Sequence, residues 1–102
     1  MIEQRKSRYV TRAINDELNI EIQALLWGLW DSIAVNRKDK MDYLQVFEIV
    51  TDGKKLKVMN RQEQPAMSEE LVIEQCSMEI SNIIVWIIDE LNKQTMLLPS
   101  DY

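Results

Sequence analysis

Few side chains in this sequence are of the kinds that perform acid–base, nucleophilic or metal chemistry. The 102 residues contain no histidine, which removes the commonest general base and most metal sites. Cys76 therefore has no histidine to activate it, and a buried structural role is expected for it. Neighbouring carboxylates occur at Glu69–Glu70 and Asp89–Glu90, but their spacing specifies neither acid–base catalysis nor a calcium loop. We expect a protein that is not an enzyme and has no cofactor or metal; a small carboxylate–metal enzyme is the catalytic alternative.

Two basic segments could contact nucleic-acid phosphates. A glycine-rich phosphate loop is excluded, because Gly28 is expected in a helix and Gly53 in a turn. The remaining candidates are the N-terminal bases, with a tyrosine that could stack on a base, and the lysines of a predicted hairpin tip: Arg5, Lys6, Arg8, Tyr9, Arg12, Lys54, Lys55 and Lys57. An accessory protein that contacts nucleic acid is therefore an alternative function, and a solvated chain end and hairpin tip are the simpler explanation.

Acidic residues are concentrated late in the chain. Residues 62–102 hold eight acids and one base, and the whole chain has a net charge of −5. Such a region repels a phosphate backbone and suits a basic protein partner, such as the groove of a nucleic-acid enzyme. The alternative is that the acids only keep the protein in solution. The carboxylates in this region that could bind a partner are Glu69, Glu70, Glu74, Glu79, Asp89 and Glu90.

Length and composition predict a single cytoplasmic domain spanning residues 1–102, with residues 1–7 as a flexible basic N-terminus. The longest apolar run, residues 83–88, is far shorter than the ~18 residues that span a bilayer, so no membrane contact is expected. The first residues lack the apolar stretch of a signal peptide. The single cysteine excludes an intramolecular disulfide and fits a reducing compartment.

The pattern of residues predicts an α+β fold. Its mainly antiparallel sheet of about five strands carries one long amphipathic helix on one face, in strand-helix-hairpin-strand-strand order. We expect a first strand over residues 8–14, last strands over residues 82–89 and 94–98, and either helix or strand over residues 66–81. The helix is expected from Leu18 to Val35, capped by Asn15-Asp16. Its core stripe comprises Leu18, Ile22, Leu25, Leu26, Leu29 and Ile33.

The most specific local signal is a β-hairpin formed by residues 43–50 and 55–62. Asp52-Gly53 is typical of a two-residue type I′ turn, which would place Glu48 opposite Lys57. The core face would then carry Phe47, Ile49, Leu56 and Val58, with Phe47 opposite Val58 and Ile49 opposite Leu56. The other face would carry Leu44, Val46, Glu48, Lys57 and Met59, joined by Trp86 or Val85.

This predicted arrangement leaves two apolar surfaces without a segment that covers them. One helix about 10 Å wide cannot cover both faces of a sheet about 20 Å wide, so residues 66–81 or a partner must cover the second face. On the helix, Ile20, Trp27 and Ala34 lie opposite the core stripe, with Trp30 beside them. Glu17, Glu21 and Asp31 would form an acidic rim around this patch. We expect these residues to bind a protein partner or a second copy, unless another segment packs over them.

Several blocks of the chain resemble one family of small bacterial proteins, the domain-of-unknown-function family nine-sixty. The blocks are Arg8-Tyr9-Val10-Thr11-Arg12, Leu25-Leu26-Trp27, Asp42-Tyr43-Leu44-Gln45-Val46-Phe47-Glu48, Gln62-Glu63-Gln64-Pro65, Thr95-Met96-Leu97-Leu98 and Asp101-Tyr102. The resemblance implies a mixed α/β domain of Gram-positive bacteria and their plasmids, phages and chromosomal cassettes. It also implies an extended conformation for residues 71–76, and it supplies no catalytic residue.

Membership of mobile elements, as the resemblance implies, favours a short list of functions for a small acidic protein. The leading expectation is an inhibitor or accessory factor that binds a basic nucleic-acid-handling host protein. A CRISPR nuclease effector and a DNA-repair enzyme are examples of such targets. This expectation rests on association, because fold likeness alone does not determine function.

Overall fold

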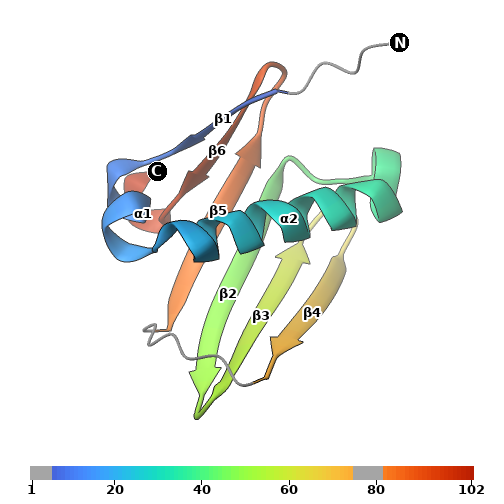
Figure 1. The fold of residues 1–102 in the computed structure, drawn as a ribbon. Helices are drawn as coiled ribbons and strands as arrows, with labels where there is room; N and C mark the ends of the chain where they lie inside the picture. Colours follow the sequence, from blue (N-terminus) through green and yellow to red (C-terminus); the bar gives the residue numbers. More distant parts are fainter. Residues whose placement is uncertain (1–5, 75–81) are drawn as a thin grey trace.

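A six-stranded sheet with one long helix across one face forms the molecule (Figure 1). The computed structural model describes residues 6–74 and 82–102. The strands lie side by side in the order β1-β6-β5-β2-β3-β4. The elements are β1 Ser7–Val10, α1 Arg12–Glu17, α2 Ile20–Arg37, the 3₁₀ turn η1 Lys38–Lys40, β2 Leu44–Asp52, β3 Lys55–Gln62, β4 Met67–Ile73, β5 Ile83–Asp89, β6 Lys93–Leu97 and the 3₁₀ turn η2 Pro99–Asp101.

The α+β class is confirmed, but the predicted sheet was too small and too uniform. The sheet has six strands, and β1 pairs with β6 in parallel while the other neighbours are antiparallel. Strand β1 ends at Val10, because Thr11 caps α1 by accepting a hydrogen bond from the backbone N–H of Ile14. The predicted strand over residues 8–14 was therefore too long.

Two helices replace the single predicted one. Leu18 is extended, with φ −120° and ψ 132°, and separates α1 from α2. The side chain of Asn19 then caps α2 by accepting a hydrogen bond of 2.9 Å from the N–H of Ile22. The predicted cap at Asn15-Asp16 was wrong, since both residues lie inside α1. Thr11 and Asn19 each cap the start of a helix. The apolar pattern of the sequence continues across both helices, so it predicted a single one.

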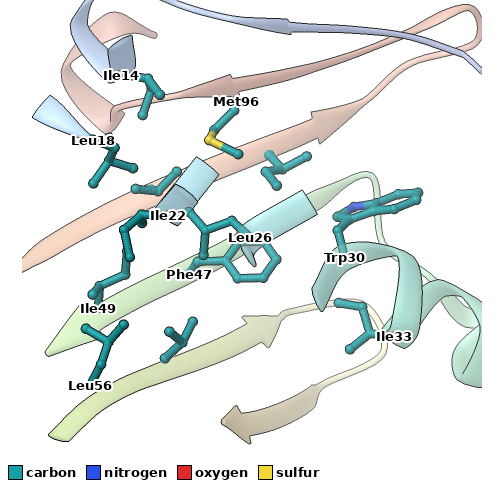
Figure 2. Packing of buried hydrophobic residues seen from close by; sticks show 13 residues of the cluster. Ile14, Leu18, Ile22, Leu26, Trp30, Ile33, Phe47, Ile49, Leu56 and Met96 are labelled. Carbon is teal, nitrogen blue, oxygen red and sulfur yellow. The ribbon is translucent and has the colours of Figure 1, made fainter. Parts of the chain in front are cut away.

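The core fills the space between the helices and one face of the sheet (Figure 2). Ile22, Leu26, Trp30 and Ile33 face it from α2. Leu25 and Leu29, which the predicted stripe included, are only partly buried. The stripe was misplaced because it counted only aliphatic residues, whereas the buried side of α2 also carries polar side chains. The sheet and α1 with its following residue contribute Ile14, Leu18, Phe47, Ile49, Leu56, Val58, Val85, Ile87 and Met96.

The predicted hairpin is present with a register shifted by two residues. Asp52 pairs with Lys55, so the turn consists of Gly53 and Lys54. Gly53 has φ +62° at the first central position, the arrangement of a type II′ turn. Because the shift is even, every side chain keeps its predicted face. The partners change, however: Glu48 lies opposite Met59 and not Lys57, and Phe47 lies opposite Asn60.

Strand β4 resolves part of the ambiguous segment. It pairs antiparallel with β3 and extends the sheet sideways (Figure 1). The predicted extended conformation is confirmed at Leu71–Ile73, whereas residues 75–81 lie outside the described part of the chain. The alternative of a helix starting at Ser68 is wrong. Since β4 lies at the edge of the sheet, it does not cover the face opposite α2.

Candidate functional site

The two tryptophans of the predicted patch on α2 contact other parts of the same chain. Trp30 is 8% exposed and belongs to the core, so its assignment to the partner surface was wrong. Trp27 is half-buried, and the guanidinium carbon of Arg8 lies 4.7 Å from its ring centroid and 5.9 Å from that of Trp30. These distances fit cation–π contacts. The segment that covers this side of the helix is therefore β1.

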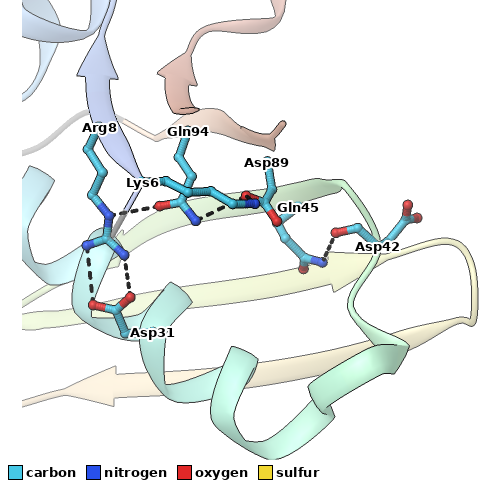
Figure 3. A network of polar contacts seen from close by, with 7 residues as sticks. All are labelled: Lys6, Arg8, Asp31, Asp42, Gln45, Asp89 and Gln94. Carbon is cyan, nitrogen blue, oxygen red and sulfur yellow. Dashed lines mark hydrogen bonds and ion pairs between the residues drawn. The ribbon is translucent and has the colours of Figure 1, made fainter. Parts of the chain in front are cut away.

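Arg8 is held in place by a polar network that joins β1, α2 and the last hairpin (Figure 3). Its guanidinium forms an ion pair with Asp31, and its Nε donates to Oε1 of Gln94 at 2.8 Å. Gln94 donates in turn to Asp89, which lies 2.7 Å from Nζ of Lys6. Asp31 is thus a partner of Arg8 within the molecule. Asp89 likewise serves to fix the N-terminal strand.

The remaining members of the predicted patch lie near the start of α2. Ile20 is 73% exposed, with exposed Glu17 and Glu21 beside it in the sequence. Ala34 is partly buried against the core. A single isoleucine with two acids is a small remnant of the expected surface, because isolated exposed apolar side chains are common in soluble proteins.

The predicted acidic residues do not form one surface. Glu69 and Glu70 are neighbours on β4 and so point to opposite faces of the sheet. Bases lie near several of them: Lys57 at 3.7 Å from Glu70, Lys55 at 3.8 Å from Glu74 and Lys93 at 4.0 Å from Glu90. Glu79 lies outside the described residues. The acidic and basic blocks of the sequence therefore partly neutralise one another in the fold.

The face of the sheet opposite α2, which we call the outer face, is left uncovered by the two α-helices of the described residues. Cross-strand pairs at its centre join Val46 to Trp86 and Leu44 to Ile88. Ile84 is 40% exposed, and the other members are half-buried. Neither α1 nor α2 packs over them, and the C-terminal Tyr102 contacts Trp86 at one edge. The outward-pointing residues of its central strands are Leu44, Val46, Glu48 and Val50 of β2, Ile84, Trp86 and Ile88 of β5, and Met59 of β3 between the basic Lys57 and Arg61.

A concavity of about 550 Å³ opens at one end of the outer face. The pairing of β5 with β6 ends at Trp86 and Leu97, so the first residues of β5 extend beyond β6. Beyond this point the chain turns into η2, and the side chain of Tyr102 packs edge-on against Trp86 at 5.7 Å. The concavity is lined by Glu48, Val50, Asn82, Ile83, Ile84, Leu98, Pro99 and Ser100.

A second polar cluster is buried between the end of α2 and the β2–β3 hairpin. Arg37 donates to carboxamide oxygens of Gln45, Asn60 and Gln62 at 2.9–3.2 Å. Burial lowers the pKa of Arg37, and the charge of Glu69 acts in the opposite direction. Gln62 also donates to the backbone carbonyls of Lys40 and Pro65. This cluster ties the connecting loops to the sheet, which is a structural role.

The described residues contain no cluster of three cysteine or carboxylate side chains that could hold a metal ion. Among the described helices, none is both long and apolar enough to cross a bilayer.

Comparison with protein families gives a match over residues 7–101 to the family described as Staphylococcal protein of unknown function (DUF960). The chain belongs to the DUF960 family. None of the curated proteins matches it.

A solved structure supports the fold of this DUF960 domain. It is described as the crystal structure of the protein of unknown function from Enterococcus faecalis, and it has 21% sequence identity to this chain. The likeness covers 95% of this chain and 91% of that chain, with a TM-score of 0.72. At this identity the comparison shows the shared fold alone.

Sequence reasoning placed Glu48 on this surface of the DUF960 domain with Leu44, Val46 and Met59, but it paired Glu48 with the wrong residue of β3. The outward side of β2 reads Leu44, Val46, Glu48 and Val50, which is apolar except for one acid. A solvated sheet face is normally polar. The apolar residues on the outward side of β2 were the available signal that this face differs from a solvated one. The incorrect pairing of Glu48 with Lys57 concealed the charge of Glu48, which is unpaired among the described residues.

Proposed function

We propose that this protein is a non-catalytic protein-binding module and that the outer face is its contact surface. The observation that carries the proposal is the largely apolar character of this face across β5 and β2, while α2 packs on the other face. Contiguous exposed apolar surface on a domain marks a binding site more often than scattered apolar residues do. Trp86 lies within this face, and tryptophan is enriched among residues that dominate binding energy.

The partner that suits this surface is a protein with a basic contact region. The chain has a net charge of −5, and Glu48 lies on the outer face between apolar residues of β2. Opposite charge accelerates association and disfavours wrong partners. The specific role we propose is an inhibitor or accessory factor, of the kind carried by mobile elements, for a nucleic-acid-handling protein such as a CRISPR nuclease effector or a DNA-repair enzyme.

Direct contact with nucleic acid is supported less well by the geometry. Lys6 and Arg8 form ion pairs with Asp89 and Asp31, so these N-terminal bases already have anionic partners. Lys57 at the hairpin has Glu70 near it. Binding to phosphate would require these carboxylates to be displaced or left beside another anion.

Affinity capture from a staphylococcal lysate, followed by mass spectrometry, tests the proposal with two matched variants. Ile84→Arg places a bulky cation on the outer face opposite Glu48, where an Arg–Glu pair across the strands supports the fold. Ile20→Arg makes the same change on α2, where the side chain is also exposed. We expect Ile84→Arg to lose the captured protein and Ile20→Arg to retain it.

Circular dichroism on both variants confirms that each remains folded. Capture that depends on Ile20 and not on Ile84 would move the contact surface to the start of α2. Identical capture by both variants and the unchanged protein would contradict a role for the outer face.

A further inference from the structure

Glu48 is an acidic side chain whose directly opposite neighbours are apolar, and the outward positions on either side of its β3 neighbour hold Lys57 and Arg61. Its cross-strand neighbours are Met59 on β3 and Ile84 on β5. Among the residues that the structure describes, no base lies within ion-pairing distance of its carboxylate. Lys57, the base predicted to face it, lies opposite Val50 and 3.7 Å from Glu70. The half-buried carboxylate therefore lacks a cation, in contrast to Glu70 on the same face of the sheet.

The surroundings of Glu48 fit a long cationic side chain. The concavity beside it has apolar walls formed by Val50, Ile84, Leu98 and Pro99, with Glu48 as its acidic lining residue. Lysine and arginine combine an aliphatic stem with a charged head, and the stem packs well against apolar surface. A carboxylate accepts short, strong hydrogen bonds from either head group.

Other occupants match this concavity poorly. An apolar side chain would remove water from Glu48 without pairing its charge, which is costly for a carboxylate. An acidic group would meet like charge at short range. Charge complementarity therefore favours a cation, and the apolar walls favour one carried on an aliphatic stem.

We infer that the concavity beside Glu48 receives an arginine or lysine side chain of the protein partner. The inference rests on the proposed function, because it places one anchor of that partner on the outer face. It assigns Glu48 as the residue that recognises a basic group, and the apolar residues around it as the surface that excludes water from the ion pair.

Nuclear magnetic resonance titration with N-acetyl-arginine amide tests the inference without the partner. This probe has the guanidinium and the stem but no free carboxylate. The neutral citrulline analogue is the control probe. We expect arginine amide to shift the backbone amide signals of Glu48, Ile84 and Ser100. Binding should weaken at least tenfold in Glu48→Gln, which is isosteric, and should be unchanged in Glu21→Gln on α2.

Equal binding of arginine amide to the unchanged protein and to Glu48→Gln would overturn the inference, as would equal binding of the citrulline analogue. Capture from lysate separates this result from the proposed function. Capture lost in Ile84→Arg but kept in Glu48→Gln would retain the outer face as the contact surface and reject the basic anchor. Arginine binding that requires Glu48, with capture unaffected by either variant, would retain the site and reject the proposed function.

Discussion

Individual side chains contribute to this fold through two kinds of contact. Phe47 is fully buried and packs in the centre of the core beneath α2 (Figure 2). Arg8 lies at the surface and joins β1 to α2 through aromatic, ionic and hydrogen-bonding contacts. The first contribution depends on excluded water and close packing, and the second on a network of weaker polar contacts.

Phe47→Ala should lower the free energy of unfolding by about 3–5 kcal/mol, because it leaves a cavity in the core. Glu48→Gln, one position along the same strand, should change it by less than about 0.5 kcal/mol, since no ion pair is lost. Urea denaturation of both variants measures the two values. The reverse ranking would show that the faces of β2 are assigned incorrectly.

Arg8→Gln should reduce stability by about 1–2 kcal/mol, because it removes an exposed ion pair, a cation–π contact and a hydrogen bond. Tryptophan fluorescence should shift to longer wavelength as Trp27 gains contact with water. Arg12→Gln is the control, since Arg12 is exposed at the start of α1. Unchanged fluorescence in Arg8→Gln would contradict the covering role of Arg8.

Whole elements were predicted more reliably than their boundaries and partners. The hairpin faces and the last two strands, predicted over residues 82–89 and 94–98, followed from period-two alternation and turn residues. The break at Leu18 did not, because the apolar pattern continues through it. The burial of Trp30 and Arg37 depends on side chains from distant strands, which local spacing does not contain.

Asn19→Ala should lower the free energy of unfolding by about 1 kcal/mol, because α2 loses the side chain that caps it. Asp16→Ala should change it by less than about 0.5 kcal/mol, since Asp16 is an exposed residue within α1. Thermal or urea unfolding compares the two. A larger loss for Asp16→Ala would favour a single helix beginning near residue 16.

At the scale of the whole molecule, charge that is segregated in the sequence becomes interleaved in space. Lys6 and Lys55 come from basic segments, and each lies beside a carboxylate of the acidic region, Asp89 and Glu74 respectively. The charge blocks of the sequence therefore overstate the acidity of any one surface. Whether the outer face is covered by β4 could not be read from the sequence. Only the strand order showed that β4 pairs at the edge of the sheet and does not pack over this face.

We expect no tight binding of single-stranded or duplex DNA near physiological salt. The net charge of −5 opposes association with DNA. Lys6 and Lys57 already lie beside carboxylates, so these ion pairs would have to break before either lysine could bind a phosphate. Gel-shift titration up to micromolar protein should show no complex. A shift that weakens as salt increases would instead support the nucleic-acid-contacting alternative.

The parallel pair of β1 and β6 also bears on how the protein is made. Arg8 and Gln94 are 86 positions apart, so the first strand leaves the ribosome long before its partner strand has been translated. The β2–β3 hairpin needs only nearby residues and can form earlier. Until residues 93–97 emerge, β1 has no ladder to join and Trp27 lacks its fixed cover. A nascent chain at that stage exposes apolar surface that the completed chain covers once the final hairpin has been translated.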